Sequence, residues 1–122
     1  MNVLLGLEGS DESMNALRRT IERTVDAGDD LTVVIVEKPG VERTPAAMRH
    51  QAEDLLEKAN VNADVEILDG DPGSTLVAYA ERGDFDELVL GGGTIGPIGK
   101  IRLGPITEYV LMNATMTVTL VR

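Results

Sequence analysis

The sequence has no cysteine and no tryptophan among its 122 residues, and it has only two tyrosines and one phenylalanine. The absence of cysteine excludes disulfides and thiolate metal sites, and it favours a reducing compartment, which we expect to be the cytoplasm. With so few aromatic rings, we expect no stacking platform for single-stranded nucleic acid. The sequence also lacks a secretory signal pattern and any apolar run near the roughly 20 residues of a membrane span, so we expect no attachment to a membrane.

Basic residues are scarce: eleven lysines and arginines stand against 21 aspartates and glutamates, which gives a formal net charge of −10. Such a surface repels the phosphate backbone of nucleic acids, so we expect no nucleic-acid partner. Only three of the basic residues are lysines. An acidic surface poor in lysine is typical of proteins from a high-salt cytoplasm, although an ordinary acidic protein fits the composition as well.

Strand-like and helix-like patterns alternate along the chain, which predicts an α/β fold with a parallel sheet and right-handed crossovers. Three expected strands are continuous apolar runs, typical of strands covered on both faces, and two alternate apolar with polar residues, typical of sheet edges. We therefore predict one domain over residues 1–122, with an open five-stranded sheet in the order 3-2-1-4-5 and helices on both faces. The expected strands are residues 3–7, 31–36, 63–67, 88–90 and 115–120.

Capping residues and prolines mark the expected helix starts. Ser10 precedes an acidic first turn, Thr44 and Asp71 each precede a proline, and Pro105 begins the last helix. Apolar residues at helical spacing predict the buried faces of the first two helices. These residues are Met14, Leu17, Ile21 and Val25 in the first helix, and Met48, Ala52, Leu55 and Ala59 in the second.

A glycine-rich stretch, LGGGTIGPIGKIRLGPITEYV, runs from Leu90 to Val110 and follows the fourth expected strand. In a sheet of this order, ligands lie at the carboxyl ends of strands 1 and 4, where the crossover direction reverses. Glycines let backbone amides converge on an anion, and the helix N-terminus at Gly104 adds donors. Lys100 and Arg102 add positive charge. The pattern predicts an anion site, although a sharp turn whose cations offset the acidic surface explains it equally well.

Three segments carry a resemblance to a known family: VLLGLEGSDESMNAL (residues 3–17), GDPGSTLVAYAERGDFDELVLGG (residues 70–92) and the glycine-rich stretch. Over its whole length the chain resembles the universal stress protein family. The first segment is similar to the family's opening strand, acidic residue, Gly-Ser pair and first helix, and the second to its Gly-x-Pro helix and fourth strand. The resemblance implies a Rossmann-like fold of the adenine nucleotide alpha hydrolase type.

The glycine-rich stretch is similar to the family's nucleotide signature, in which a glycine, two residues, a glycine and nine residues lead to a glycine and then Ser or Thr. Gly91 and Gly104 stand at the first and third glycine positions, whereas Thr94 takes the second and Pro105 the place of Ser or Thr. Proline suits the first helical position but has no amide hydrogen and no hydroxyl group. The next two amides of the helix therefore remain as donors.

Two further departures concern the neighbouring loops. Glu8 stands where the family usually has Asp, and residues 38–44, between strand 2 and the second helix, are fewer than in many relatives. Glu8 either approaches a ribose or a nucleotide-bound Mg²⁺ ion, or only stabilises the adjoining helix N-terminus. The short segment leaves less wall to cover a ligand.

The resemblance implies an adenine nucleotide (ATP, ADP or AMP) or a related phosphate ligand, bound without catalysis. The base is then expected on aliphatic groups at the ends of strands 1 and 2, and the phosphates on the glycines and the last helix N-terminus. Lys100 and Arg102 restore part of the binding that the altered signature loses. The residues expected at this site are Leu7, Glu8, Val36, Gly91, Gly92, Gly93, Thr94, Lys100, Gly104, Ile106 and Thr107.

No catalytic group stands out in the sequence. His50 is the only histidine and lies in a polar stretch, and Ser10 has no histidine beside it that would make it a nucleophile. We therefore expect neither an enzyme nor a protein-bound metal site.

The last strand, about residues 115–121, carries neither proline nor lysine to block pairing at its outer edge. It is therefore expected to form a homodimer across a two-fold axis, as the family resemblance also implies. The alternative function is a dimeric interaction module without nucleotide, whose glycine-rich loop holds an inorganic anion or a partner's acidic group.

Overall fold

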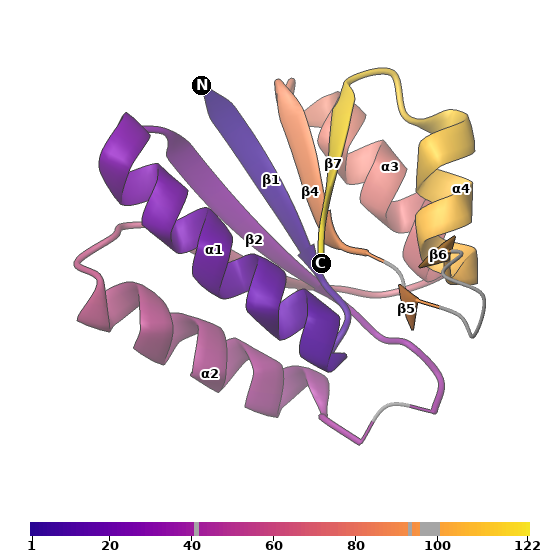
Figure 1. Cartoon of the computed structure of the whole chain (residues 1–122), viewed down its shortest axis with the longest axis horizontal. Coiled ribbons are helices and arrows are strands. Elements are labelled where there is room, and N and C mark those ends of the chain that lie inside the picture. The colour runs from indigo at the N-terminus through magenta and orange to yellow at the C-terminus, as the bar shows by residue number, and fades with distance from the viewer. Residues whose placement is uncertain (41, 93, 96–100) are drawn as a thin grey trace.

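The computed structural model describes residues 1–40, 42–92, 94–95 and 101–122, in which helices and strands alternate (Figure 1). The strands of the main sheet are β1 (Asn2–Leu7), β2 (Asp30–Val36), β3 (Asp64–Leu68), β4 (Glu87–Gly91) and β7 (Thr117–Val121). The helices are α1 (Asp11–Ala27), α2 (Pro45–Lys58), α3 (Pro72–Arg82) and α4 (Pro105–Asn113). The helix starts agree with the predicted capping residues and prolines.

Neighbouring strands of the main sheet are all parallel, in the order β3-β2-β1-β4-β7. Because β7 is the fifth strand of this sheet, the predicted order 3-2-1-4-5 is confirmed. Helices α1 and α2 cover one face and α3 and α4 the other (Figure 1). All five strands therefore point the same way, and the sheet has a carboxyl end, near Leu7, Val36 and Gly91, and an amino end, near Asn2 and Glu87.

Two apolar cores fill the space between the sheet and its helices. Leu5 of β1 and Leu17 of α1 belong to the core under α1 and α2, whereas Leu4 of β1 and Leu76 of α3 belong to the core under α3 and α4. Successive side chains of a strand point to opposite faces, so a strand covered on both sides needs apolar residues throughout. This explains the continuous apolar run of β1.

Three residues predicted to be buried in the first two helices are placed differently. Val25 is 56% exposed, because the helical repeat carries the buried face of α1 from Ile21 to Thr24. The Thr24 hydroxyl group can be buried there because it donates a hydrogen bond of 2.8 Å to the Thr20 carbonyl oxygen. In α2 the predicted Met48 and Ala52 are buried together with Leu56, whereas the predicted Leu55 and Ala59 are only partly buried.

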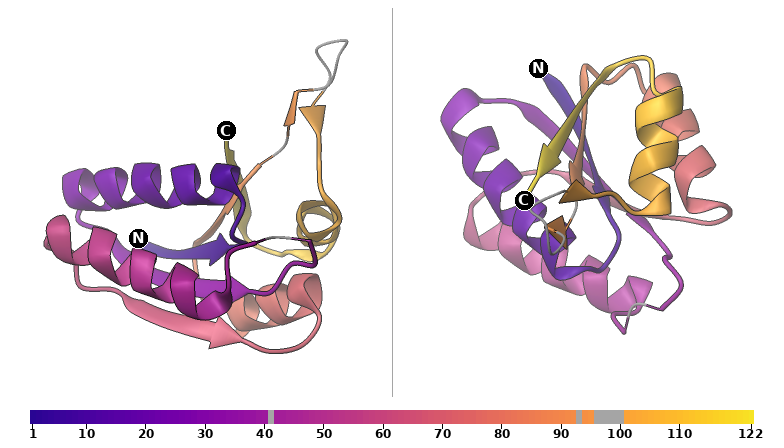
Figure 2. Two further views of the ribbon diagram at one scale, coloured as in Figure 1. Left: turned by 90° about the horizontal axis from the view of Figure 1, so that it is seen from below. Right: turned by 45° about the vertical axis from the view of Figure 1, so that its right-hand side comes forward.

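A second, two-stranded sheet was not predicted. The strands β5 (Thr94–Ile95) and β6 (Ile101–Arg102) form an antiparallel pair in which Thr94 lies opposite Arg102. This pair stands away from the carboxyl end of the main sheet (Figure 2). The glycines of this stretch predicted an anion-binding loop or a sharp turn, and the strands at its two ends were not expected.

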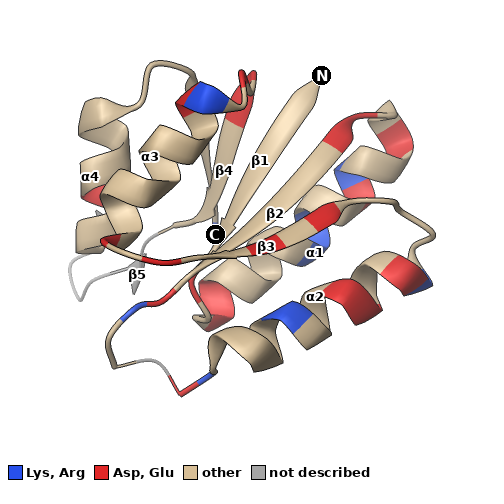
Figure 3. Cartoon of the chain, turned by 180° about the vertical axis from the view of Figure 1, so that it is seen from behind, with Lys and Arg blue, Asp and Glu red and all other residues tan. Residues whose placement is uncertain are grey.

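The distribution of acidic residues over the surface is consistent with the acidic composition. Acidic residues are spread over α2 and β3 in the view from behind (Figure 3). None of the helices in the described part of the chain combines the length and the apolar character that a membrane crossing requires.

Candidate functional site

The four helices differ in how their N-termini are closed. Side-chain oxygens of Ser10, Thr44 and Asp71 accept hydrogen bonds from first-turn amides of α1, α2 and α3, at 3.1, 3.1 and 3.0 Å. Helix α4 instead follows Gly104, and no described side chain caps it. Since Pro105 has no amide hydrogen, the free donors are the next two amides. This helix end lies at the carboxyl end of the sheet, where the ligand was predicted.

Lys38, which follows β2, lies beside this uncapped helix end. Its Nζ atom is 3.7 Å from the position that a Cβ atom would take on Gly104. The same Nζ atom is 3.6 Å from Oε2 of Glu8, the residue directly after β1. One ammonium group thus joins the carboxyl ends of β1 and β2 to the N-terminus of α4.

Glu8 is a buried carboxylate, with only 4% of its surface exposed. Burial raises the pKa of Glu8 above its ordinary value of 4.5, the charge and hydrogen bond of Lys38 lower it in part, and the charge of Glu12 raises it further. The net direction is upward, so Lys38 compensates the lost hydration of Glu8 incompletely. The fold therefore leaves a poorly stabilised negative charge at this end of the sheet.

A cavity of about 410 Å³ opens next to Lys38, between the β2–α2 segment and the first turns of α3 and α4. Its volume falls within the range of small-ligand pockets. Apolar groups make most of its wall, with Lys38 and Asp71 as its charged members. The lining residues are Lys38, Pro39, Asp71, Pro72, Gly73, Pro105, Ile106 and Tyr109.

Arg43 is a second cation at this end of the sheet. Its guanidinium group donates to the carbonyl oxygen of Gly9 and, at 2.8 Å, to the carboxylate of Asp11. It therefore ties the segment after β2 to the turn that begins α1. Neither Lys38 nor Arg43 was singled out from the sequence, but a signal existed, because both follow strand 2 and the predicted order places that strand beside strand 1.

Gly91, the last residue of β4, and Gly92 directly after it have packing roles. A Cβ atom on Gly91 would lie 2.4 Å from the backbone N and Cα of Ser13, so the strand end and the first turn of α1 approach as closely as glycine allows. A Cβ atom on Gly92 would lie 2.7 Å from Cβ of Leu120, and the Gly92 amide donates to the Val121 carbonyl oxygen at 2.8 Å. The Gly92 amide is thus engaged within the sheet, and phosphate contacts of these glycines stay a prediction.

The remaining predicted residues divide into three groups. The side chains of Leu7 and Val36 are 0% and 1% exposed and lie in the two cores, so their backbone is the part that can meet a ligand. Ile106 and Thr107, 8% and 3% exposed, are in the first turn of α4 beside Gly104. Thr94 is in the β5–β6 pair, whereas Gly93 and Lys100 lie outside the described residues.

A second cavity, of about 470 Å³, lies between α1 and β7 and is lined by Arg19, Arg23 and Arg122, among others. The Arg23 guanidinium group is bonded to Glu87, and Arg19 donates to the main-chain carbonyl oxygen of Arg122. Two of these cations are therefore already engaged in holding α1 to the sheet.

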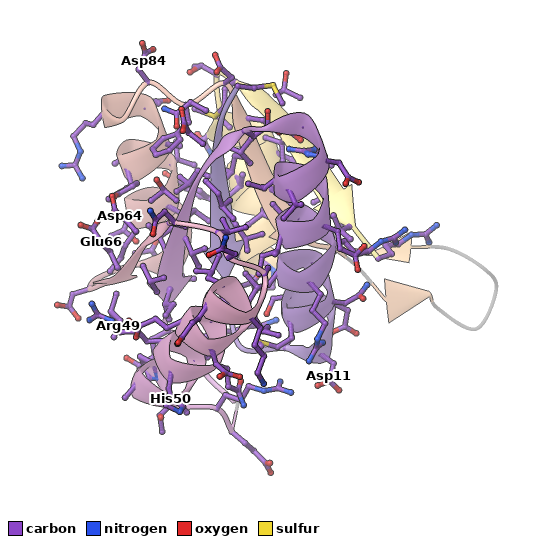
Figure 4. All side chains as sticks on the ribbon, turned by 90° about the vertical axis from the view of Figure 1, so that its left-hand side faces the viewer. Asp11, Arg49, His50, Asp64, Glu66 and Asp84 are labelled. Atoms are coloured by element: carbon purple, nitrogen blue, oxygen red, sulfur yellow. The ribbon has the colours of Figure 1, made fainter. Side chains whose placement is uncertain are left out.

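No group of three or more His, Asp or Glu side chains that could hold a metal ion occurs in the described ranges. His50 is exposed on the outer face of α2, next to Arg49 (Figure 4). The Ser10 hydroxyl group accepts from the Ser13 amide as a helix cap.

The fold and the arrangement at its carboxyl end define a class of small α/β proteins with a ligand crevice at the switch point of the sheet. Within this class, the family model described as "Universal stress protein family" matches residues 1–122, so the chain belongs to the universal stress protein family. No curated protein matches the chain.

Solved structures of the family share this fold. A universal stress protein from Archaeoglobus fulgidus is 21% identical with a TM-score of 0.77, covering 100% of this chain and 98% of its own. UspA from Lactobacillus plantarum is 24% identical with a TM-score of 0.77, and the match covers 100% of this chain and 97% of UspA. The Archaeoglobus fulgidus protein in complex with dAMP is 20% identical with a TM-score of 0.70, covering 100% and 98%.

Proposed function

We propose that this protein is a non-catalytic regulator of the stress response that binds an adenine nucleotide, or a related phosphate ligand, at the carboxyl end of its sheet. The observation that carries the proposal is the position of Lys38, whose ammonium group adjoins both the uncapped start of α4 and a cavity of about 410 Å³. The dAMP complex of a family member supports the choice of ligand class.

The phosphate group is proposed to bind at the first turn of α4. The amides of Ile106 and Thr107 point from a helix N-terminus, which carries a partial positive charge, and Lys38 adds a full one. Because Pro105 removes one donor and Glu8 is close, this end of the site suits one phosphate group better than a triphosphate. Mg²⁺ bound to the ligand would reduce the repulsion from Glu8.

The base and ribose are proposed to occupy the apolar part of the cavity. Pro72, Ile106 and Tyr109 provide flat or aliphatic surface there. Since the side chains of Leu7 and Val36 are enclosed in the cores, they contribute backbone only. Gly91 to Thr94, Lys100 and Arg102 remain proposed contacts for the distal phosphates of a longer ligand.

Calorimetric titration with AMP, dAMP, ADP and ATP, each with and without Mg²⁺, tests this function. We expect Lys38→Met to weaken binding of AMP at least about tenfold, because a charge-assisted contact is lost. Lys58→Met is the matched control, since Lys58 is exposed on α2 and pairs with Asp54. Because Lys38→Met leaves Glu8 without this partner, Lys38→Met with Glu8→Gln keeps the test valid if the single variant is unstable. Absence of heat at about 1 mM of every nucleotide would overturn the proposal.

The alternative function, an interaction module that holds an inorganic anion or a partner's acidic group, rests on Thr94 and Pro105, which depart from the nucleotide signature. Titration with adenosine and with inorganic phosphate separates the two functions. Binding of phosphate without any gain from the adenosine moiety favours the module, whereas nucleotide extracted from the freshly purified protein favours the nucleotide regulator.

The absence of catalysis is part of the proposal. Among the described residues, His50 is exposed on the outer face of α2, and the acidic residues form no metal cluster. Nucleotide incubated with the protein should therefore remain intact at the rate seen in buffer alone. Release of phosphate at a rate proportional to protein concentration would contradict this.

We further propose a homodimer through β7. The Val121 carbonyl oxygen points toward β4, so the backbone groups of Val118 and Leu120 point to the outer edge of the sheet. Val118→Pro should block pairing at this edge and keep the bonds to β4. Sedimentation should show a dimer for the native chain and a monomer for the variant, and a native monomer at high salt would contradict the proposal.

A further inference from the structure

Lys38 serves two partners at once in the structure. Its Nζ atom is 3.6 Å from the buried Glu8 carboxylate and beside Gly104 at the start of α4. An anion that binds to the first turn of α4 therefore arrives within a few ångströms of Glu8 and competes with it for the same ammonium group.

We propose that binding of an anionic ligand at this site is coupled to the uptake of one proton by Glu8. This inference rests on the proposed function and adds its regulation. The ligand draws the charge of Lys38 toward itself and brings a second negative charge close to a carboxylate that is only 4% exposed. Two like charges in a poorly hydrated place are avoided when one of them is protonated. The Glu8 carboxylate takes the proton from solvent and becomes a neutral carboxyl group.

The charged groups around Glu8 favour this outcome. Lys38, from the segment after β2, is the cation that pairs with it, while Glu12 on α1 adds negative charge. Arg43, from the same segment as Lys38, is already bonded to Gly9 and Asp11. Burial holds the pKa of Glu8 above its ordinary value even before a ligand arrives. The ligand therefore has to raise the pKa of Glu8 by less than it would have to for an exposed glutamate.

The coupling makes affinity depend on pH. Between the pKa of Glu8 in the free protein and its higher pKa in the complex, affinity rises by up to about tenfold for each unit by which the pH falls. A fall in the pH around the protein would then load it with ligand without any change in ligand concentration.

The test is calorimetric titration of AMP into the native chain at about pH 7, in two buffers with different enthalpies of ionisation. The dependence of the heat on the buffer gives the number of protons taken up, for which we expect a measurable uptake of up to about one proton beyond the control. Glu8→Gln is that control, because it removes the carboxyl group and keeps the titration of the AMP phosphate. Glu12→Gln, which removes a neighbouring carboxylate, should retain the uptake.

The affinities provide an independent readout. Glu8→Gln should bind AMP more tightly than the native chain at about pH 8, and this gain should shrink as the pH falls toward about 6. If AMP binds but Glu8→Gln changes neither the proton uptake nor the pH dependence, the coupling is wrong and the proposed function survives. If neither AMP nor inorganic phosphate binds at either pH, the proposed function fails and the coupling fails with it.

Discussion

The two ends of the sheet each contain a buried glutamate, and the surroundings of the two shift the pKa in opposite directions. Glu87, at the amino end of β4, is 5% exposed and receives two hydrogen bonds of 3.0 Å from Arg23 and one of 2.6 Å from Thr119. Burial alone would raise the pKa of Glu87, but these bonds and the charge of Arg23 lower it below 4.5. Glu8, at the carboxyl end, has a raised pKa, and among the described side chains Lys38, at 3.6 Å, is its only ion-pair partner.

The contrast teaches which carboxylate belongs to the scaffold. Glu87 joins α1, β4 and β7 through a fully bonded charge, which is a structural use of a buried acid. Glu8 is incompletely stabilised, and its partner Lys38 lines a cavity and adjoins a free helix end, as is typical of functional groups.

Two glycines repeat this contrast within the carboxyl end itself. Gly91 is packed against the backbone of α1, whereas the nearest atom to a Cβ on Gly104 would be Lys38 Nζ at 3.7 Å. One glycine is needed by the fold, and the other leaves a helix end open.

The largest effect is expected for Gly91→Ala. Its Cβ would lie 2.4 Å from backbone atoms of Ser13, which cannot yield without moving α1. We expect a loss of about 3 kcal/mol or more in the free energy of unfolding, measured by chemical denaturation. A loss below about 1 kcal/mol would show that this contact is less rigid than described.

Glu87→Gln should be the next most destabilising change, because it leaves a charged guanidinium group without its carboxylate. We expect a loss of about 1.5–3 kcal/mol near neutral pH. The pKa of Glu87 is lowered in the folded protein. Its contribution to the free energy of unfolding is therefore present above about pH 4.5 and is lost as the pH falls below that value. The native chain should therefore lose its advantage over the variant in acid. Glu81→Gln, at an exposed position of α3, is the control.

Glu8→Gln should have the opposite sign. Since the folded pKa of Glu8 is raised, its ionised form opposes folding, and the native chain loses stability as the pH rises from 4.5 through the raised value. The variant should be more stable than the native chain by about 1 kcal/mol at neutral pH and equal to it in acid. Denaturation at several pH values measures this, and a destabilised variant at neutral pH would reverse our comparison.

The smallest effect on stability is expected for Gly104→Ala. Its φ of −75° suits any residue and no atom is closer than 3.7 Å, so the loss should stay within about 0.5 kcal/mol. The added methyl group nevertheless stands between Lys38 and the first turn of α4. Affinity for AMP should fall severalfold, and unchanged affinity would place the ligand elsewhere.

The fold could be predicted because its determinants are local. Ser10, Thr44 and Asp71 indicate helix starts because their side chains accept hydrogen bonds from first-turn amides. Continuous or alternating apolar runs distinguish central from edge strands. The β5–β6 pair escaped prediction because glycine permits extended and turned backbone alike. Lys38 and Arg43 leave no periodic pattern in the sequence, and only the predicted strand order, which places the segment after strand 2 beside the end of strand 1, could have indicated their contacts with Glu8, Gly9 and Asp11.

The account depends on the start of α4 being the place where an anion binds. Two-dimensional amide NMR during titration with AMP tests this directly. We predict that the largest shifts fall on the amides of Ile106 and Thr107, followed by Glu8 and the segment around Lys38. Saturable binding that leaves the amides of Ile106 and Thr107 unmoved, with the shifts collected instead along β7 or beside Arg19 and Arg122, would contradict it.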